Sequence, residues 1–505
     1  MGPRSRVELA PPAANPCSVD ATIRYPFLSL YPPESGLSQS KAPVAGLTCL
    51  TKRRASRRQT SFVARTEVLS SVTSMNRPPS PESIRALVRD VIPNVVVESI
   101  STSATSQLQR IFTIKISDGR VLSLRLAPLA SGLLRYEQWP ILSEARLTGW
   151  IFRVSAEQSA EKSEEPRKQG TDGSDWNGAS PEKGEGADPK VFHSVRRRML
   201  RYLPNLVAHS STPTELSSAF NIFEPTIGTP ISSLSRPLTT TERDLVNFQK
   251  GQLMRYISEF TSPNGKFGLA VATLEPLMSA ELQGQQPSVG CDGLKTWKKA
   301  FHSLLEAILR DAEDQSVAIS YETIRGHFHR LSHLLDTITT PRLVVLDAAE
   351  DNNVLVSRLS EERGDISSTT STASSEPCIA VTGLCDWSNS VFGDPLFATA
   401  FTQDPTPAFI RGFRKSPSTS LSCDATTKDS KIADDDEDNV DDDNTSPIED
   451  RENAPIRLLL YECYHATAAV VRQFYRPGAD SSEREIAARR RLTAVLARLE
   501  GVGWD

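Results

Sequence analysis

A change in hydrophobic periodicity along the chain constrains the fold more than any other sequence feature. Over 111–126, two short runs alternate apolar and polar residues on either side of an Asp-Gly pair, which predicts a β-hairpin with one buried face. Beyond Leu238, apolar residues recur instead at the spacing of amphipathic helices. We therefore expect an α+β fold of two lobes: a small sheet-bearing lobe with its linker over 81–235, and a larger, mainly helical lobe over 236–505.

The helical periodicity predicts individual helices in both lobes. One helix follows Ser80 and ends before Pro93, because proline cannot continue it. A second runs over about 136–152. Two more, over 455–475 and 481–500, are separated by a Pro-Gly pair and finish the chain.

Three polar stretches without periodicity interrupt these lobes, at 155–190, 357–377 and 415–452, and we expect them to be disordered insertions. Residues 1–80 are rich in Pro, Ser and Arg and are predicted to form a disordered tail. The basic cluster at 51–58 leaves an organelle-targeting segment or a nuclear-import patch open as alternatives.

Composition narrows the compartment and the partners. The net charge is -5, with the acidic excess mainly in 434–443, so nothing favours a nucleic-acid partner. The seven cysteines are scattered without a CxxC pair, which indicates neither a zinc site nor a disulfide framework. No apolar run approaches the roughly 18 residues that cross a bilayer. We expect an intracellular, cytoplasmic protein with no membrane partner, unless the basic tail directs it to the nucleus or an organelle.

Polar residues cluster at the ends of short apolar segments in the helical half. In VVLDAAEDNNVLV, Asp347 is followed by Asn352 and Asn353, and in IAVTGLCDW the apolar run ends at Asp386. Phosphoryl transfer needs a carboxylate that orients the attacking hydroxyl, and oxygen ligands that hold magnesium against the phosphates. One strand-end loop from each side of a hairpin could bring these groups together.

The competing interpretation is a pair of solvated turns. The common phosphate-loop, dinucleotide, hydrolase and zincin signatures are absent from the sequence. An Asp followed five residues later by Asn arises by chance in most proteins of this size, and Asx residues cap ordinary turns. An unrelated α+β protein with ordinary turns therefore stays open.

A family resemblance joins these segments. The strings over 343–356 and 383–397, together with LSLRLAP and EARLTGW upstream, resemble the aminoglycoside phosphotransferase-like branch of the protein-kinase superfold. More closely, they are similar to a large fungal group of such proteins. The resemblance covers about 82–500 apart from the three insertions, and it implies a two-lobed protein-kinase-like fold.

The resemblance implies an ATP- and Mg²⁺-dependent phosphotransferase that acts on a hydroxyl of an unidentified small-molecule or protein acceptor. Asp347 would orient that hydroxyl. Asp386, with Asn352 or Asn353, would hold magnesium. Asp394, in the Gly-Asp-Pro string, would brace the metal loop.

Three further positions carry the implied nucleotide site. Arg125 would contact the nucleotide phosphates and would be positioned by Glu144, which matches the helix glutamate of the family. Glu224, in the linker-like string NIFEPTIG, would complete the nucleotide site.

Departures from the family pattern keep a second function open. Arg125 stands where the family has lysine, and arginine keeps the charge but not the compact ammonium geometry. Val345 stands two residues before Asp347, where active members have histidine. The expected phosphate-covering loop, 101–110, has no glycine. The alternative is a pseudokinase that serves as a binding or scaffolding module.

Overall fold

The computed structural model describes residues 79–103, 109–128, 132–161, 198–211, 216, 218–275, 293–358, 379–415 and 446–503. All of them belong to one compact unit, Thr51–Asp505. The predicted tail and most of the three predicted insertions lie outside the described residues.

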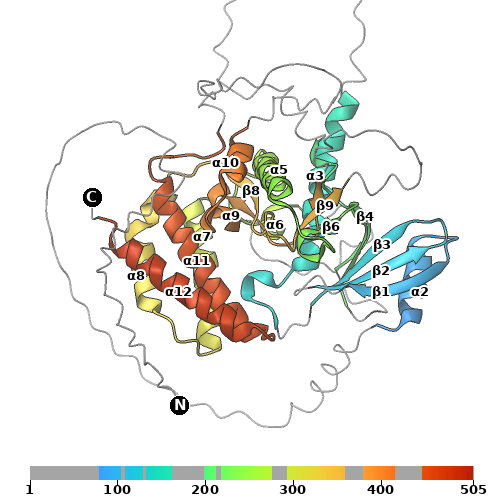
Figure 1. Ribbon diagram of the computed structural model, residues 1–505, viewed down its shortest axis with the longest axis horizontal. Helices are drawn as coiled ribbons and strands as arrows, with labels where there is room; N and C mark the ends of the chain where they lie inside the picture. The colour runs from blue at the N-terminus through green and yellow to red at the C-terminus, as the bar shows by residue number, and fades with distance from the viewer. Residues whose placement is uncertain are drawn as a thin grey trace, which may run out of the picture. The chain divides into compact units, whose positions relative to one another are not determined.

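The smaller lobe contains a five-stranded antiparallel sheet in the order β1–β2–β3–β5–β4 (Figure 1). The predicted hairpin is confirmed as β2 and β3. The turn between them contains Gly119, whose φ of 87° lies in the region that glycine adopts without strain. The strands are β1 (Val97–Ser103), β2 (Arg110–Ile116), β3 (Val121–Leu126), β4 (Asn205–Ser210) and β5 (Phe220–Glu224).

Helix α2 (Pro81–Val91) packs its apolar stripe against this sheet. Ser80 caps the first turn by accepting a hydrogen bond from the Ser83 amide at 3.1 Å. Ile84 and Val88, one turn apart, are buried among strand side chains. The strands contribute Val97, Phe112, Ile114, Ile116, Leu122, Leu124, Leu126, Phe220 and Ile222 to this core.

Helix α3 (Pro140–Glu161) links the sheet to the rest of the molecule. A 3-10 turn, η3 (Arg135–Glu137), precedes it, so the helix starts later than predicted. Pro140 explains the start, because a proline suits the first turn of a helix and not its interior. The helix extends to Glu161, so the beginning of the first predicted insertion is helical. Asn221 of β5 holds α3 to the sheet by donating to the Ile141 carbonyl at 2.9 Å.

The larger lobe is mainly helical, as predicted. Helices α11 and α12 pack against each other, as do α5 and α10 (Figure 1). The helices are α5 (Thr240–Ser258), α6 (Ala270–Thr273), α7 (Trp297–Asp314), α8 (Tyr321–Leu331), α9 (Thr399–Thr402), α10 (Pro407–Arg414), α11 (Ala454–Tyr475) and α12 (Ser481–Glu500), with 3-10 turns η4 (Ile231–Ser233), η5 (Ser332–Leu335) and η6 (Pro395–Phe397).

An aromatic cluster forms the centre of this lobe. Trp297 of α7 packs edge-on against Phe397, with ring centroids 5.4 Å apart, and donates its indole N–H to the Tyr461 hydroxyl at 2.7 Å. Gly393 lies against the Trp297 ring, and a β-carbon there would collide with it. The glycine of the Gly-Asp-Pro string is therefore required by packing, whatever the chemistry of the loop.

Six further strands form two three-stranded sheets in the larger lobe and its linker. One sheet has the order β10–β9–β6 and the other β7–β11–β8. The strands are β6 (Thr229–Pro230), β7 (Gly268–Leu269), β8 (Arg342–Val345), β9 (Val354–Arg358), β10 (Ile379–Leu384) and β11 (Ser390–Gly393).

The architecture confirms the predicted α+β fold, a small antiparallel sheet lobe followed by a mainly helical lobe. Residues 446–452, placed in the third predicted insertion, instead contact the helical lobe: Glu449 accepts hydrogen bonds from the amides of Thr339 and Thr340. Among the described helices, none combines the length and the apolar character that a membrane span requires.

Candidate functional site

Strand pairing brings the two carboxylate loops together. Strand β8 runs antiparallel to β11, with Val345 opposite Ser390, and β9 runs antiparallel to β10, with Val354 opposite Leu384. The loop from β8 to β9 and the loop from β10 to β11 are thus joined to the same two strand pairs, and they must lie side by side. The stretch over 344–356 is therefore not a hairpin turn, because its two strands belong to different sheets.

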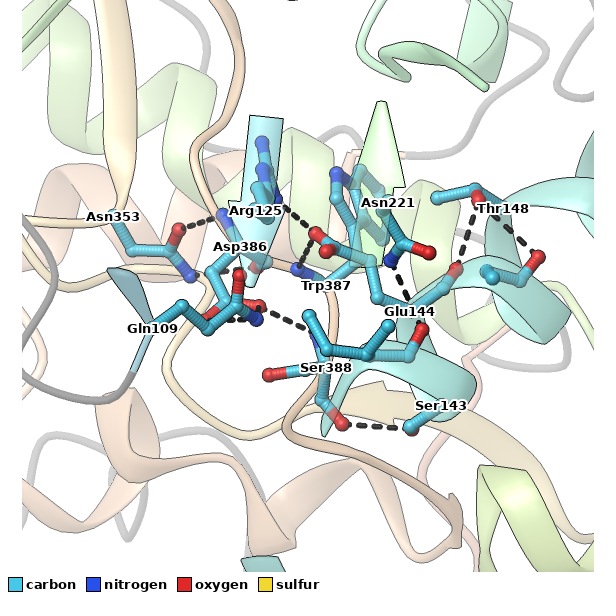
Figure 2. Close-up of polar contacts among 12 residues, drawn as sticks. Gln109, Arg125, Ser143, Glu144, Thr148, Asn221, Asn353, Asp386, Trp387 and Ser388 are labelled. Carbon is cyan, nitrogen blue, oxygen red and sulfur yellow. Dashed lines mark hydrogen bonds and ion pairs between the residues drawn. The ribbon is translucent and has the colours of Figure 1, made fainter. Parts of the chain in front are cut away.

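Asn353 bridges the two loops (Figure 2). Its side-chain oxygen accepts the Asp386 amide at 2.8 Å, and its Nδ2 donates to the Asp386 carbonyl at 3.1 Å. The same Nδ2 lies 3.2 Å from Asp347 Oδ1. Asn353 is buried, whereas the side chain of Asn352 is exposed at the rim. Of the two asparagines that the sequence left open, Asn353 is the one that contacts both aspartates.

The two aspartates differ in their surroundings. Burial, together with the neighbouring carboxylates of Glu350 and Asp386, raises the pKa of Asp347 well above its usual range. Asp386 accepts the Ser388 amide at 2.7 Å, and Gln109 Nε2 lies 3.5 Å from both of its carboxylate oxygens (Figure 2). A 3.5 Å contact is a weak hydrogen bond at most.

A buried ion pair between Arg125 of β3 and Glu144 of α3 lies behind the Asp386 loop (Figure 2). Glu144 Oε1 also accepts the Trp387 amide at 3.3 Å, which ties the pair to that loop. Burial raises the pKa of Glu144 to about 7, although Arg125 opposes the shift. Arg125 also lies 4.7 Å over the Phe223 ring.

The remaining two predicted positions lie apart from the aspartates. Glu224 is held at the end of β5 by Arg120 at 2.7 Å and Asn205 at 3.0 Å. Asp394 accepts hydrogen bonds from Arg457 and Tyr461 of α11 and from the backbone of η6, so it anchors a helix.

A cavity of about 220 Å³ opens beside the loops. Asp347, Asn352, Asn353 and Asp386 line it, whereas Arg125, Glu144 and Glu224 do not. Side chains that sequence reasoning did not select complete the wall: Tyr136, Glu137, Trp139, Glu350, Tyr464, His465, Arg472, Arg476 and Arg491.

Some of these missed residues carried a weak sequence signal. His465, Ala468 and Arg472 recur at helical spacing on α11, so a charged residue falls on the inward face of an apolar helix. Burial lowers the pKa of His465 to about 3, and the ring, stacked on Phe397, lies 2.7 Å from the Phe397 carbonyl. Gln109 lies in the expected phosphate-covering loop, 101–110, but its contact with Asp386 was not predicted.

The oxygen groups fit magnesium only in combination with a ligand. Among the described residues, no cluster of three or more acidic, histidine or cysteine side chains could hold a metal ion. Magnesium is commonly bound through one or two carboxylates plus substrate phosphates, and does not need an all-protein cage. The Asp386 carboxylate suits that mode of binding, and Asn353, whose side-chain oxygen accepts the Asp386 backbone amide, holds the loop that carries it.

Known protein families and curated sequences give no match to this chain. Solved structures do. A putative aminoglycoside phosphotransferase from Ralstonia eutropha is 11% identical, covers 84% of this chain and 99% of its own, and has a TM-score of 0.43. A putative fructosamine-3-kinase from Thermobifida fusca is 12% identical over 82% and 100% of the two chains, with a TM-score of 0.40. A GDP complex of an aminoglycoside 2'-phosphotransferase is 12% identical over 82% and 97%, with a TM-score of 0.40. Likeness at this level assigns neither an activity nor a substrate.

Proposed function

We propose that the protein is a kinase-like phosphotransferase that moves the γ-phosphoryl group of ATP to a hydroxyl. The observation that carries the proposal is the Asn353 bridge, which keeps Asp347 and Asp386 together on the wall of one cavity. Phosphoryl transfer depends on positioning and charge stabilisation more than on covalent protein chemistry. The two bridged carboxylates supply the positioning, and magnesium held by Asp386 would supply the charge stabilisation.

The proposed roles follow from the contacts. Asp347 accepts the proton of the acceptor hydroxyl, whose oxygen forms a bond to the γ-phosphorus while the bond from that phosphorus to the β–γ bridging oxygen breaks and ADP leaves. Its raised pKa suits a group that must hold this proton. Asp386 would hold magnesium together with the nucleotide phosphates, and Asn353 keeps the two carboxylates in place. Bound magnesium would neutralise charge on the phosphates.

Arg125 and Glu144 are proposed to support the phosphate end of the nucleotide. Among the described residues, Arg125 Nε and Glu144 Oε2 are buried without a hydrogen-bond partner. Buried polar atoms without partners are uncommon and call for an explanation, for which an absent ligand is one candidate. Glu224 has no such spare capacity, because both Arg120 and Asn205 bind it.

The test measures binding and transfer separately, with purified full-length protein. MgATP should raise the melting temperature, since a ligand at a hundred times its Kd adds about 2.7 kcal/mol of stability. Asp386→Asn should weaken MgATP binding at least about tenfold, whereas Asp336→Asn, at an exposed ion pair with Lys298, should not. Asp347→Asn should bind MgATP but lose γ-phosphate transfer. Failure of MgATP to stabilise the wild type would contradict the proposal.

A pseudokinase is the second candidate, and Gln109 favours it. The Gln109 amide faces both oxygens of the Asp386 carboxylate, on which a metal ion would have to bind. If this contact blocks the site, Gln109→Ala should raise MgATP affinity while γ-phosphate release stays at the level of Asp347→Asn. Release well above that level in the wild type would exclude the pseudokinase.

A further inference from the structure

Helix α11 contributes to the wall of the cavity that the two carboxylate loops also line. Its residues His465, Ala468 and Arg472 face the cavity at helical spacing. Asp347 and Glu350 line the same cavity from the loop that follows β8. A molecule that offers its hydroxyl to Asp347 would therefore have the rest of its atoms near α11.

Three arginines line the cavity, and two of them are neutralised. Arg476 donates from Nη1 and Nη2 to the two carboxylate oxygens of Glu137, at 2.6 and 2.9 Å. Arg491 pairs with Glu462 at 3.2 Å and donates to the Thr402 carbonyl. Both guanidinium groups therefore have a carboxylate partner, although Arg476 Nε, like Arg472 Nε, is buried without a hydrogen-bond partner among the described residues.

Arg472 is different. Among the described residues it forms no ion pair, and its guanidinium donates only to the Tyr136 hydroxyl, at 3.3 Å. Its Nε is buried and has no partner in the described part of the chain. Burial raises the pKa of Tyr136 to about 12, so the phenol stays neutral and does not balance the charge of Arg472.

The nearby carboxylate of Glu350 does not form an ion pair with Arg472. Glu350 Oε1 accepts a long hydrogen bond from the Thr399 hydroxyl, at 3.4 Å. A guanidinium withdrawn from water costs free energy unless it is paired and hydrogen-bonded. Arg472 has a donor, Nε, and a positive charge available beside the cavity that holds Asp347.

We propose that the acceptor is a small hydroxylated anion whose carboxylate or phosphate binds Arg472 while its hydroxyl faces Asp347. The inference rests on the proposed function, because it names the substrate class of the same site. Guanidinium groups bind both kinds of oxyanion in a fork of parallel hydrogen bonds. The cavity volume of about 220 Å³ lies below the roughly 300–1,000 Å³ of typical drug-sized sites, so it favours a small acceptor.

The test is a set of four ligands on one carbon skeleton, with charge as the variable. Glycerate and glycerol 3-phosphate are the anions, glycerol is the neutral control and 3-amino-1,2-propanediol is the cation. Saturation-transfer NMR on the full-length protein measures binding of each, with and without MgATP. We expect at least one anion to bind at least about tenfold more tightly than glycerol and the cation, as a charge-assisted contact requires. The two anions distinguish a carboxylate site from a phosphate site.

Variants assign the binding to Arg472. Arg472→Gln should reduce anion binding to the level of glycerol, and Arg472→Lys should retain part of it. Arg484→Gln, at an exposed pair with Asp480 on α12, should leave it unchanged. If Arg472→Gln fails to fold, the comparison of the four ligands on the wild type still decides.

The outcomes separate this inference from the proposed function. Binding of glycerol or the cation as tight as that of the anions, no anion binding at all, or full anion binding by a folded Arg472→Gln would each overturn the anionic acceptor. Anion binding without any MgATP binding would leave the anion site standing and remove the phosphotransferase. MgATP binding without anion binding would leave the phosphotransferase standing and overturn the anionic acceptor.

Discussion

Two buried arginine–carboxylate pairs in this molecule differ in how completely they are hydrogen-bonded. In the helical lobe, Asp394 binds Arg457, Tyr461 and the Leu396 amide, and Arg457 also donates to the carbonyls of Asp450 and Glu449. In the sheet lobe, Arg125 and Glu144 bind each other, but Arg125 Nε and Glu144 Oε2 have no partner among the described residues.

The difference separates a structural role from a ligand-binding one. A complete buried network fixes the packing of its elements and has no capacity for a ligand. An incomplete one carries a cost that a bound group could remove. Arg457–Asp394 therefore stabilises the helical lobe, whereas Arg125 Nε and Glu144 Oε2 keep unused hydrogen-bonding capacity, which we propose serves a nucleotide phosphate.

The largest effect should come from breaking the complete pair. Arg457→Met would leave the Asp394 carboxylate buried without its cation, and we expect a loss of about 3–5 kcal/mol in the free energy of unfolding. Urea denaturation of the full-length protein measures it. Arg484→Met, at an exposed pair, is the control and should change stability by less than about 0.5 kcal/mol. A loss at Arg457 no larger than at Arg484 would remove the structural assignment.

Breaking the incomplete pair should reduce stability less than breaking the complete pair, and it should weaken ligand binding. After Arg125→Met, Glu144 can bind a proton near neutral pH, because its pKa is already about 7, so no buried charge has to remain. We expect a loss of about 2–3 kcal/mol, with MgATP binding at least about tenfold weaker. Urea denaturation and calorimetry measure the two. Equal stability losses for Arg125→Met and Arg457→Met would show that the completeness of hydrogen bonding does not distinguish the two pairs.

The number of hydrogen-bonding atoms that have partners also distinguishes the two asparagines of the Asp347 loop. Asn353 uses both its oxygen and its nitrogen on Asp347 and Asp386, so Asn353→Ala should cost about 1–2 kcal/mol and separate the two loops. Asn352 is exposed, and Asn352→Ala should stay within about 0.5 kcal/mol. Thermal unfolding of the two variants measures the difference. A larger effect at Asn352 would favour Asn352 over Asn353 as the residue that holds the two loops together.

Local pattern predicted much of the fold. The last two helices lie within a residue of their expected bounds, because the pair Pro477-Gly478 ends one and the apolar stripe of each is long. The hairpin of β2 and β3 likewise follows from alternation on either side of Gly119. In such segments the residues that decide the structure are neighbours in the sequence.

The site was less predictable because it depends on pairing between distant segments. The sequence indicated both carboxylate loops, and the antiparallel pair of β9 with β10 brings them together as expected, but nothing in the sequence indicated that β8 pairs with β11. Spacing from Asp347 could not choose between Asn352 and Asn353, since the choice depends on the contact with Asp386. The contact of Gln109 with Asp386 and the position of Arg472 on the cavity wall likewise depend on the fold.

The smallest effect concerns pH and tests the incomplete pair directly. The pKa of Glu144 is raised from 4.5 to about 7 in the folded protein, so the folded state holds a proton that the unfolded chain releases. Its contribution to stability is fully present below about pH 4.5 and is lost as the pH rises through about 7. Glu144→Gln should therefore lose less stability than the wild type between pH 5 and pH 8, by on the order of 1 kcal/mol.

Glu224 provides the control of opposite sign. Hydrogen bonds from Asn205 and Arg120 lower its pKa, so its contribution is present at higher pH and is lost only as the pH falls below the usual range of a carboxylate. Glu224→Gln should leave the change between pH 5 and pH 8 as it is in the wild type. Urea denaturation at both pH values measures all three proteins. An identical pH dependence for the wild type and Glu144→Gln would mean that Arg125 already holds Glu144 fully charged, and the two buried pairs would then differ in their partners but not in their protonation.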